Sequence, residues 1–199
     1  MKNLAALLAL FTMLLLGATS TALAQKQRFD LQPLGLINAQ TPDKAPLHLG
    51  QSREDAVRAL GNPTSTDREF SESSNGKLDV LYYNRNKLYF LDDAFVNFEL
   101  HDNTLVFGKT FDSAFCVGAT ITTETNPDGS PTPPEQTRYL VDNTPVSELH
   151  VAEKPGKSAN IAYKLIASGY TKFGEKKSDG FFEMLFDARN KLVYIGLRD

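Results

Sequence analysis

The residues of this chain that could do acid–base or metal chemistry are three histidines, His48, His101 and His150. They lie far apart, and no His-x-x-x-His or His-x-His pair occurs. Protein zinc sites are commonly built on ligands at short, regular spacing, so this pattern does not predict a metal centre. His101 follows Glu99 in an alternating segment, which predicts a solvated side chain on an outward strand face.

Nucleophile and phosphate motifs are incomplete. No serine stands in a Gly-x-Ser-x-Gly elbow, the motif of α/β-hydrolases. Pro155–Ser158 is similar to the end of a phosphate-binding loop, but Val151 stands where that motif needs its first glycine. Cys116, the only cysteine, lies in an apolar segment, which predicts a buried thiol rather than a nucleophile or an intermolecular link. We therefore expect no enzyme activity and no cofactor.

The acidic pair Asp92-Asp93 and the pair Asp102-Asn103 have the oxygen ligands that calcium prefers. Both pairs also stand between alternating segments, where hairpin turns select Asp and Asn for backbone reasons. The turn interpretation is favoured over the calcium site.

Aromatic residues gather in one stretch of the chain: Tyr82, Tyr83, Tyr89, Phe90, Phe95 and Phe98. In strands, side chains alternate between the two faces, so one face of such a stretch should belong to the core and the other should be partly exposed. If Tyr83, Tyr89 and Phe95 share the outer face, they form a candidate protein-binding patch. The alternative is that these side chains belong to the core.

A short helix is the first element that would position these residues. Ser52 is a good N-cap, and Asp55 stands at the third helical position, close to a capping box. Ala56, Val57 and Leu60 then share one face. Gly61 suits the left-handed position after the helix, and Pro63 prevents its continuation.

Alternation with a period of two follows the helix. We expect strands over 78–83, 87–91, 94–101 and 104–107, joined by short turns. Val96, Phe98 and Leu100 should point one way and Asn97, Glu99 and His101 the other. Successive hairpins with one solvated face predict an antiparallel sheet.

The second half of the chain is less regular. Residues 111–123 fit one or two strands, the Pro-rich segment 124–137 fits an exposed loop, and 137–141 fits a strand. Thr144-Pro145 predicts the start of a helical turn through Leu149. A helix is predicted over 158–167, because Ile161, Leu165 and Ile166 would share its inward face and Gly169 would end it. A final hairpin is expected over 182–197, with its turn at 188–190.

The first 24 residues are typical of a secretory signal peptide: Lys2, an apolar run over 4–16, and small residues before a cleavage site after Ala24. We therefore expect an exported protein, periplasmic or secreted, with no integral membrane segment after cleavage. Lys2 is the only charged residue removed, so the net charge changes from −3 to −4. This mild, interspersed acidity does not favour a nucleic-acid partner.

Two segments of the chain are similar in pattern. Residues 95–106 and 182–193 each run from an alternating strand through an Asp and an Asn into a Leu-Val strand. This similarity suits two copies of a helix-plus-sheet unit, although any antiparallel hairpin could produce it. The corresponding division is a lead-in segment over 25–46 that adds one edge strand, a first unit over 47–110 and a second over 111–199.

A family resemblance rests on a set of short motifs: Gly50-Gln51-Ser52, Val57, Leu60-Gly61-Asn62-Pro63, Tyr82-Tyr83 and the Phe-rich strands after them. Together they resemble the envelope modules of the SmpA/OmlA type and the related β-lactamase-inhibitor-like fold. The resemblance covers residues 47–108. It implies a short helix packed on an antiparallel sheet, with tandem copies in the inhibitor-like proteins. The assembly lipoprotein of this type carries a lipidated cysteine, whereas this chain has Gln25 directly after the expected cleavage site.

These observations predict an α+β fold with short helices on an antiparallel sheet. The preferred function is a non-enzymatic module that binds another envelope or secreted protein, in envelope assembly or in inhibition of a secreted enzyme. The alternatives are a carrier of a small molecule or lipid, held between helix and sheet, and an uncharacterised hydrolase.

Overall fold

The computed structural model describes residues 29–31, 33–71, 76–123, 139–141, 144–146, 161, 163–173 and 176–198. The expected signal peptide (1–24) and the Pro-rich loop (124–137) lie outside the described residues.

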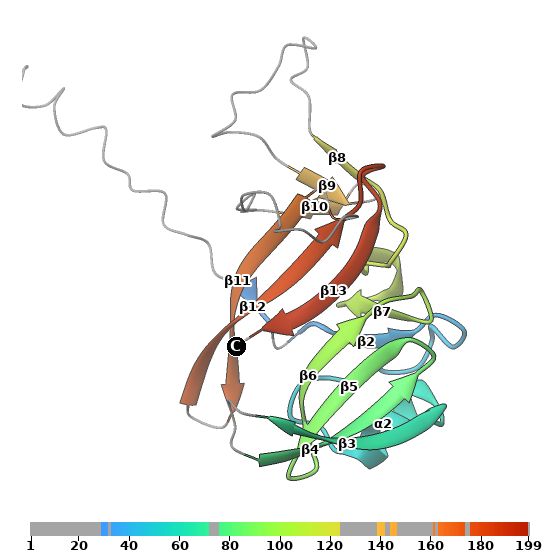
Figure 1. Ribbon diagram of the computed structural model, residues 1–199, viewed down its shortest axis with the longest axis vertical. Coiled ribbons are helices and arrows are strands. Elements are labelled where there is room, and N and C mark those ends of the chain that lie inside the picture. The colour runs from blue at the N-terminus through green and yellow to red at the C-terminus, as the bar shows by residue number, and fades with distance from the viewer. Residues whose placement is uncertain are drawn as a thin grey trace, which may run out of the picture.

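The described residues form one α-helix, α2 (Arg53–Leu60), one 3₁₀ turn, η1 (Phe111–Ser113), and the strands of three sheets (Figure 1). The strands are β1 (Phe29–Asp30), β2 (Gly35–Asn38), β3 (Ser65–Ser71), β4 (Gly76–Tyr83), β5 (Asn86–Leu91), β6 (Ala94–Leu100), β7 (Leu105–Gly108), β8 (Ile121–Thr123), β9 (Tyr139–Val141), β10 (Thr144–Val146), β11 (Tyr163–Phe173), β12 (Lys176–Phe186) and β13 (Leu192–Arg198).

The largest sheet has eight strands in the order β1-β11-β12-β13-β6-β5-β4-β3. Its neighbours are antiparallel except at one end, where β1 pairs in parallel with β11. A three-stranded sheet, β10-β9-β8, and the antiparallel pair β2-β7 complete the fold. The described part of the protein is therefore mainly antiparallel sheet with one helix. The lead-in segment contributes the edge strand β1 and also β2, a second strand that was not expected.

Helix α2 confirms the expected helix and its caps. Ser52 Oγ accepts a hydrogen bond from Asp55 N, and Asp55 Oδ2 accepts one from Ser52 N, which completes a capping box. Gly61 follows with a positive φ of 88°, a conformation that a side chain would disfavour. At this end Asn38 Nδ2 donates to Leu60 O at 2.6 Å, satisfying one of the carbonyls that a helix leaves free.

The expected strands 78–83, 87–91 and 94–101 are confirmed as β4, β5 and β6. The β5–β6 turn has positive φ at both Asp92 (48°) and Asp93 (68°), as two-residue hairpin turns require. Asp and Asn tolerate this region better than most residues, which accounts for the acidic pair without a bound ion.

Two features of this half differ from the expectation. Residues 105–108 form β7, but β7 does not return as a hairpin against β6; it leaves the large sheet and pairs with β2. The mostly polar segment Ser65–Ser71 forms β3. This strand was not predicted, because apolar residues do not alternate along the segment. β3 exists because all seven of its residues pair with β4.

Two helical expectations in the second half are wrong. Residues 163–167 belong to strand β11, which pairs along its whole length with β12, from Tyr163↔Phe186 to Phe173↔Lys176. Thr144–Val146 form β10, paired with β9, rather than a helical turn. In both places strand pairing outweighs a local pattern that fits a helix. The expected strand near 137–141 is confirmed as β9, and residues 111–123 contain one strand, β8.

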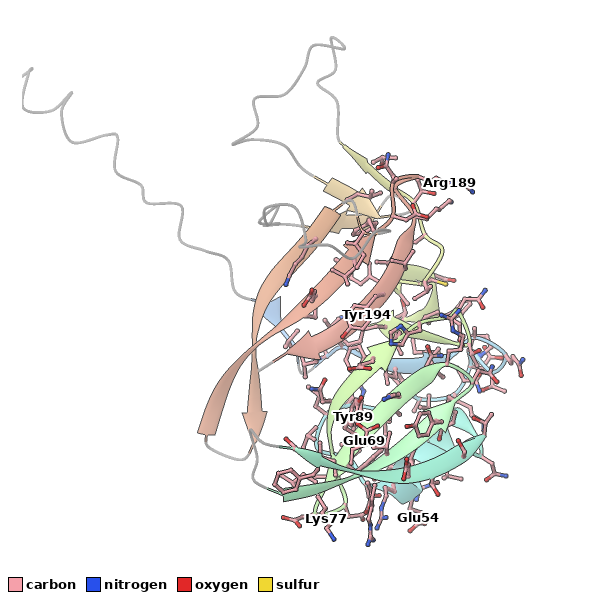
Figure 2. The ribbon with its side chains drawn as sticks, in the orientation of Figure 1. Glu54, Glu69, Lys77, Tyr89, Arg189 and Tyr194 are labelled. Atoms are coloured by element: carbon pink, nitrogen blue, oxygen red, sulfur yellow. The ribbon has the colours of Figure 1, made fainter. Side chains whose placement is uncertain are left out.

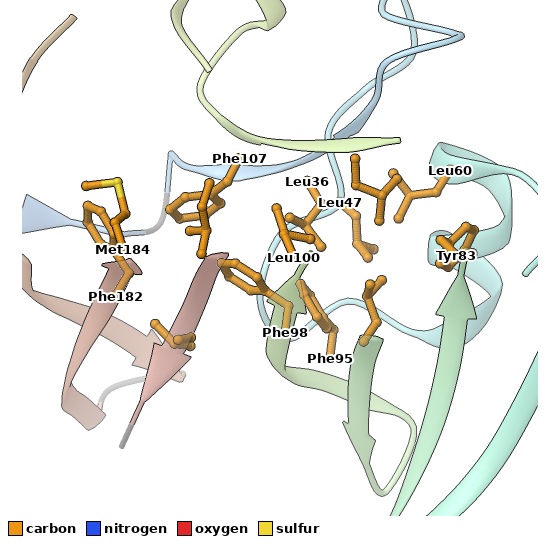
Figure 3. Packing of buried hydrophobic residues seen from close by; sticks show 14 of the residues in the cluster. Leu36, Leu47, Leu60, Tyr83, Phe95, Phe98, Leu100, Phe107, Phe182 and Met184 are labelled. Carbon is orange, nitrogen blue, oxygen red and sulfur yellow. The ribbon is translucent and has the colours of Figure 1, made fainter. Parts of the chain in front are cut away.

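The final hairpin is confirmed as β12 and β13. β13 joins the two halves, because Ile195 pairs with Leu100 and Gly196 with Glu99 of β6. The two similar segments thus differ in pairing, since β12 and β13 form a hairpin whereas β6 and β7 belong to different sheets. A single core extends across the β6–β13 junction and includes Phe98, Phe107, Phe182 and Met184 (Figure 3).

Candidate functional site

The large sheet has an inner and an outer face. The inner face packs against α2 and the β2–β7 pair, and its side chains belong to the hydrophobic core (Figure 3). The outer face of β3–β6 and β13 is turned toward the viewer in Figures 1 and 2. No described strand or helix packs on this part of the outer face (Figure 1), and side chains such as Lys87, Glu99 and His101 are partly exposed there.

Tyr83 does not lie on the outer face, contrary to the predicted patch. It belongs to the core, is 4% exposed, and its hydroxyl donates to Gly61 O at 3.0 Å. Burial raises the pKa of its phenol to about 12. Tyr83 therefore ties the end of α2 to the sheet and is not available to a partner.

Phe95 is also in the core, 1% exposed, and the reason is a β-bulge. Tyr89 pairs with Asn97 but the next residue, Phe90, pairs with Phe95, so Val96 has no opposite partner. An extra residue reverses the alternation of a strand. Phe95 and Phe98 consequently both point inward, although strict alternation would place them on opposite faces.

Tyr89 does lie on the outer face, in a cluster around Lys87, but it is buried there (8% exposed), so none of the three side chains of the predicted patch is exposed. Lys87 Nζ lies 3.0 Å from Glu69 Oε1 and 5.7 and 5.9 Å from the ring centres of Tyr82 and Tyr89. Tyr82 also donates its hydroxyl to Glu69 Oε1 at 3.3 Å. The ammonium is thus held between a carboxylate and two aromatic rings, an arrangement that favours its charged form.

The protonation states of this cluster follow from its contacts. The hydrogen bond to Glu69 raises the pKa of the Lys87 ammonium, even though partial burial opposes this shift. Burial raises the pKa of the phenols of Tyr82 and Tyr89. At neutral pH Lys87 is therefore a cation, and both phenols keep their protons.

A second cluster on the same face crosses the β6–β13 junction. The rings of His101 and Tyr194 lie 5.1 Å apart, and His101 Nε2 is 3.6 Å from Glu99 Oε2. Tyr194 lies over Gly196, where a Cβ atom would collide with the phenol ring. The absence of a side chain at Gly196 therefore leaves room for the Tyr194 ring.

We call these residues the outer-face strip. It consists of Glu69, Tyr82, Lys87, Tyr89, Glu99, His101 and Tyr194. Figure 2 labels Glu69, Tyr89 and Tyr194 among them. Tyr89 and Tyr194 are buried, so the other five side chains supply most of the exposed surface of the strip. Tyrosines beside charged groups are enriched in protein interfaces, because one side chain supplies both apolar area and a hydrogen bond. The strip offers those properties for binding.

Next to the strip, the start of α2 and strands β3 and β4 form an ion-pair cluster. Arg53 Nη1 lies 2.8 Å from Asp79 Oδ2, and Arg68 Nε lies 2.7 Å from Asp79 Oδ1. Arg53 Nε also contacts Asp93 at 2.6 Å. Hydrogen bonds from Arg68 and Arg53 hold the pKa values of Asp79 and Asp93, respectively, below the usual range of a carboxyl.

This cluster predicts a loss of stability in acid. A carboxylate whose folded pKa is lowered stabilises the fold above its unfolded pKa of about 3.9, and that contribution disappears as the pH falls further. We expect the free energy of unfolding to fall less between pH 6 and pH 3 in Asp79→Asn than in the unmodified chain. Urea unfolding at both pH values measures this difference. The exposed Asp43, which has no ion-pair partner among the described residues, provides the control Asp43→Asn; an equal effect of both substitutions would contradict the prediction.

The remaining candidates of the sequence lie in ordinary surroundings. In the described ranges no three His, Cys, Asp or Glu side chains gather as a metal site would require. Cys116 is half-buried rather than buried, and its thiol donates to Val117 O. Asp102 accepts hydrogen bonds from Arg85 N and Thr104 N, which makes it part of a turn. His150 and Pro155–Ser158 lie outside the described residues.

Sequence reasoning found part of the strip. Alternation correctly placed Glu99 and His101 together on the outer face. Tyr194 could not be added, because it meets His101 only through the pairing of β13 with β6. Arg53, Arg68 and Asp79 were missed for the same reason: they come together only when α2 packs beside β3 and β4.

Within the described residues, no helix has both the length and the apolar character needed to cross a bilayer. Comparison with protein-family models, with curated proteins and with solved structures gave no significant match.

Proposed function

We propose that this chain is an exported, non-enzymatic module that binds another envelope or secreted protein through the outer-face strip. The observation that carries the proposal is the strip itself: Glu69, Lys87, Glu99 and His101, each 30–39% exposed, lie beside partly exposed Tyr82 on a sheet face that no described element covers (Figure 1). Tyrosines and charged side chains of this kind supply much of the binding energy at protein interfaces. Export rests on the signal-like residues 1–24.

The proposed role is envelope assembly or inhibition of a secreted enzyme. It rests on the resemblance to SmpA/OmlA-type modules and to the β-lactamase-inhibitor-like fold. Helix α2 followed by the four antiparallel strands β3–β6 supports that resemblance for residues 47–108. The finer part of the proposal is a duplication, with residues 111–199 as a second unit that adds β11–β13 to the same sheet.

We prefer protein binding to the carrier alternative because of the packing behind the sheet. A carried ligand would need space between helix and sheet. There Leu60 of α2 packs with Leu47 and Tyr83, and all three are 4% exposed or less (Figure 3). These side chains occupy the place where a ligand was expected.

Affinity capture with matched variants tests the proposal. Tagged residues 25–199 are incubated with solubilised envelope and secreted fractions, and saturably bound proteins are identified by mass spectrometry. We expect the double variant Glu99→Ala/His101→Ala, at two side chains each 35% exposed, to weaken capture about tenfold while the circular dichroism spectrum is unchanged.

Lys109→Ala, an exposed substitution beyond β7, is the control and should leave capture unchanged. If the double variant captured the partner as well as the unmodified chain does, or if no partner bound saturably, the outer-face strip would be rejected as a binding surface. The core position Tyr83 is unsuitable for this test, because its substitution would change folding.

A further inference from the structure

Strand β3 ends the large sheet with a free edge. All seven residues of β3 pair with β4 on one side, and no described strand pairs with it on the other. An edge strand directs alternate N–H and C=O groups outward, where they can pair with an added strand. At the opposite end of the sheet, β1 has only two residues.

A groove runs beside this edge. A cavity of about 260 Å³ lies between the start of α2 and strands β3 and β4, lined by Arg53, Thr66, Arg68, Asp79 and Leu81 among others. A strand added to β3 would place every second side chain on the groove side of the sheet. The edge and the groove together can therefore hold both the backbone and the side chains of an extended peptide.

The groove side of β3 carries an unusual pair of exposed residues, Arg68 and Phe70. The Arg68 side chain is 70% exposed, and its ion pair with Asp79 uses Nε. Among the described residues, its two terminal nitrogens form no ion pair. Phe70, two residues further on, is 65% exposed, the largest exposure among the large hydrophobic residues of the described chain. An acidic residue next to Arg68 and an apolar one next to Phe70 would complement this side.

A second copy of the chain, paired with β3 along the whole strand, is a poor occupant. Antiparallel pairing of β3 with itself, centred on Arg68, would place Arg68 opposite Arg68 and Asp67 opposite Glu69. Like charges directly opposite one another destabilise a sheet. The outer side of β3, with Asp67 and Glu69, instead favours basic residues in the added strand.

We propose that the β3 edge and its groove bind an extended segment of a partner protein by strand addition, at a site that shares only Glu69 with the outer-face strip. The added strand runs antiparallel to β3, as do the other strand pairs in this half of the sheet. It carries an apolar residue opposite Phe70, an acidic residue opposite Arg68, and basic residues opposite Glu69 and Asp67. Main-chain hydrogen bonds supply affinity, and the charge pattern supplies specificity.

A designed peptide tests this proposal directly. The probe Thr-Val-Lys-Glu-Lys-Thr-Thr, fluorescently labelled, follows the predicted pattern from Ser71 back to Ser65, and Thr-Val-Glu-Lys-Glu-Thr-Thr reverses its charges. We expect the first peptide to bind about fivefold more tightly in fluorescence anisotropy at low salt. Arg68→Glu should reduce this preference to below about twofold, because it reverses one of the three charge pairs. The expected affinity is weak, so titration extends to about 1 mM protein.

Two further measurements separate strand addition from other binding. A peptide N-methylated at alternate positions keeps its side chains but loses ladder hydrogen bonds, and it should not bind. The double variant Glu99→Ala/His101→Ala should bind the probe peptide as tightly as the unmodified chain does. Lack of binding by the first peptide, equal binding of the methylated form, or no effect of Arg68→Glu overturns the proposal. Capture through the outer-face strip is measured separately and can succeed or fail on its own.

Discussion

Replacement of Phe98 by alanine is expected to lower the free energy of unfolding by about 3–5 kcal/mol, the usual cost of removing a buried aromatic ring. Phe98 is 1% exposed, and its ring centre lies 4.9 Å from that of Phe107 and 6.3 Å from that of Phe95. Phe107 in turn lies 5.6 Å from Phe182. The ring therefore occupies the centre of a chain of aromatic contacts.

This chain of contacts explains why the effect should be large. Phe98 belongs to β6, Phe107 to the β2–β7 pair, and Phe182 to the C-terminal hairpin. A cavity at Phe98 would remove contacts that join all three parts. Neighbouring side chains in a close-packed core can fill such a cavity only partly.

Urea unfolding at 25 °C, followed by circular dichroism, measures the change. Phe70→Ala is a matched control, because it removes the same ring from a side chain that is 65% exposed. We expect this control to change the free energy of unfolding by at most about 0.5 kcal/mol. Similar losses for the two variants would show that Phe98 is not a core residue.

Asn86→Ala is expected to cost about 2–4 kcal/mol, because it leaves two backbone N–H groups without an acceptor. Asn86 is fully buried at the start of β5. Its Oδ1 accepts from His101 N at 2.8 Å and from Asp102 N at 3.1 Å, and its Nδ2 donates to Asp102 Oδ1 at 2.8 Å. One side chain thus holds the turn that leads from β6 to β7.

Urea unfolding and amide hydrogen exchange test this prediction together. In the variant, the amides of His101 and Asp102 should exchange faster than in the unmodified chain. Asn103→Ala, at the exposed position in the same turn, is the control and should change stability by no more than about 0.5 kcal/mol. Unchanged exchange at both amides would mean that Asn86 does not hold the turn.

The sequence determined the elements whose information is local. Ser52, Asp55 and Gly61 predicted the start and end of α2, because caps satisfy backbone groups within a few residues. Asp92-Asp93 predicted a turn for a similarly local reason, namely its tolerance of positive φ. The alternation of the β4–β6 segment likewise predicted its strands, and it placed Glu99 beside His101.

The tertiary structure decided everything that depends on pairing between distant segments. Residues 163–167 are a strand because β12 offers them a full set of partners, and the polar segment β3 is a strand because β4 does. A bulge opposite β5 turned Phe95 into the core and removed it from the expected patch. The pairing of β13 with β6 brought Tyr194 to His101. Backbone hydrogen bonds between strands and the burial of side chains depend on the partner segment, so a pattern within one segment cannot fix them.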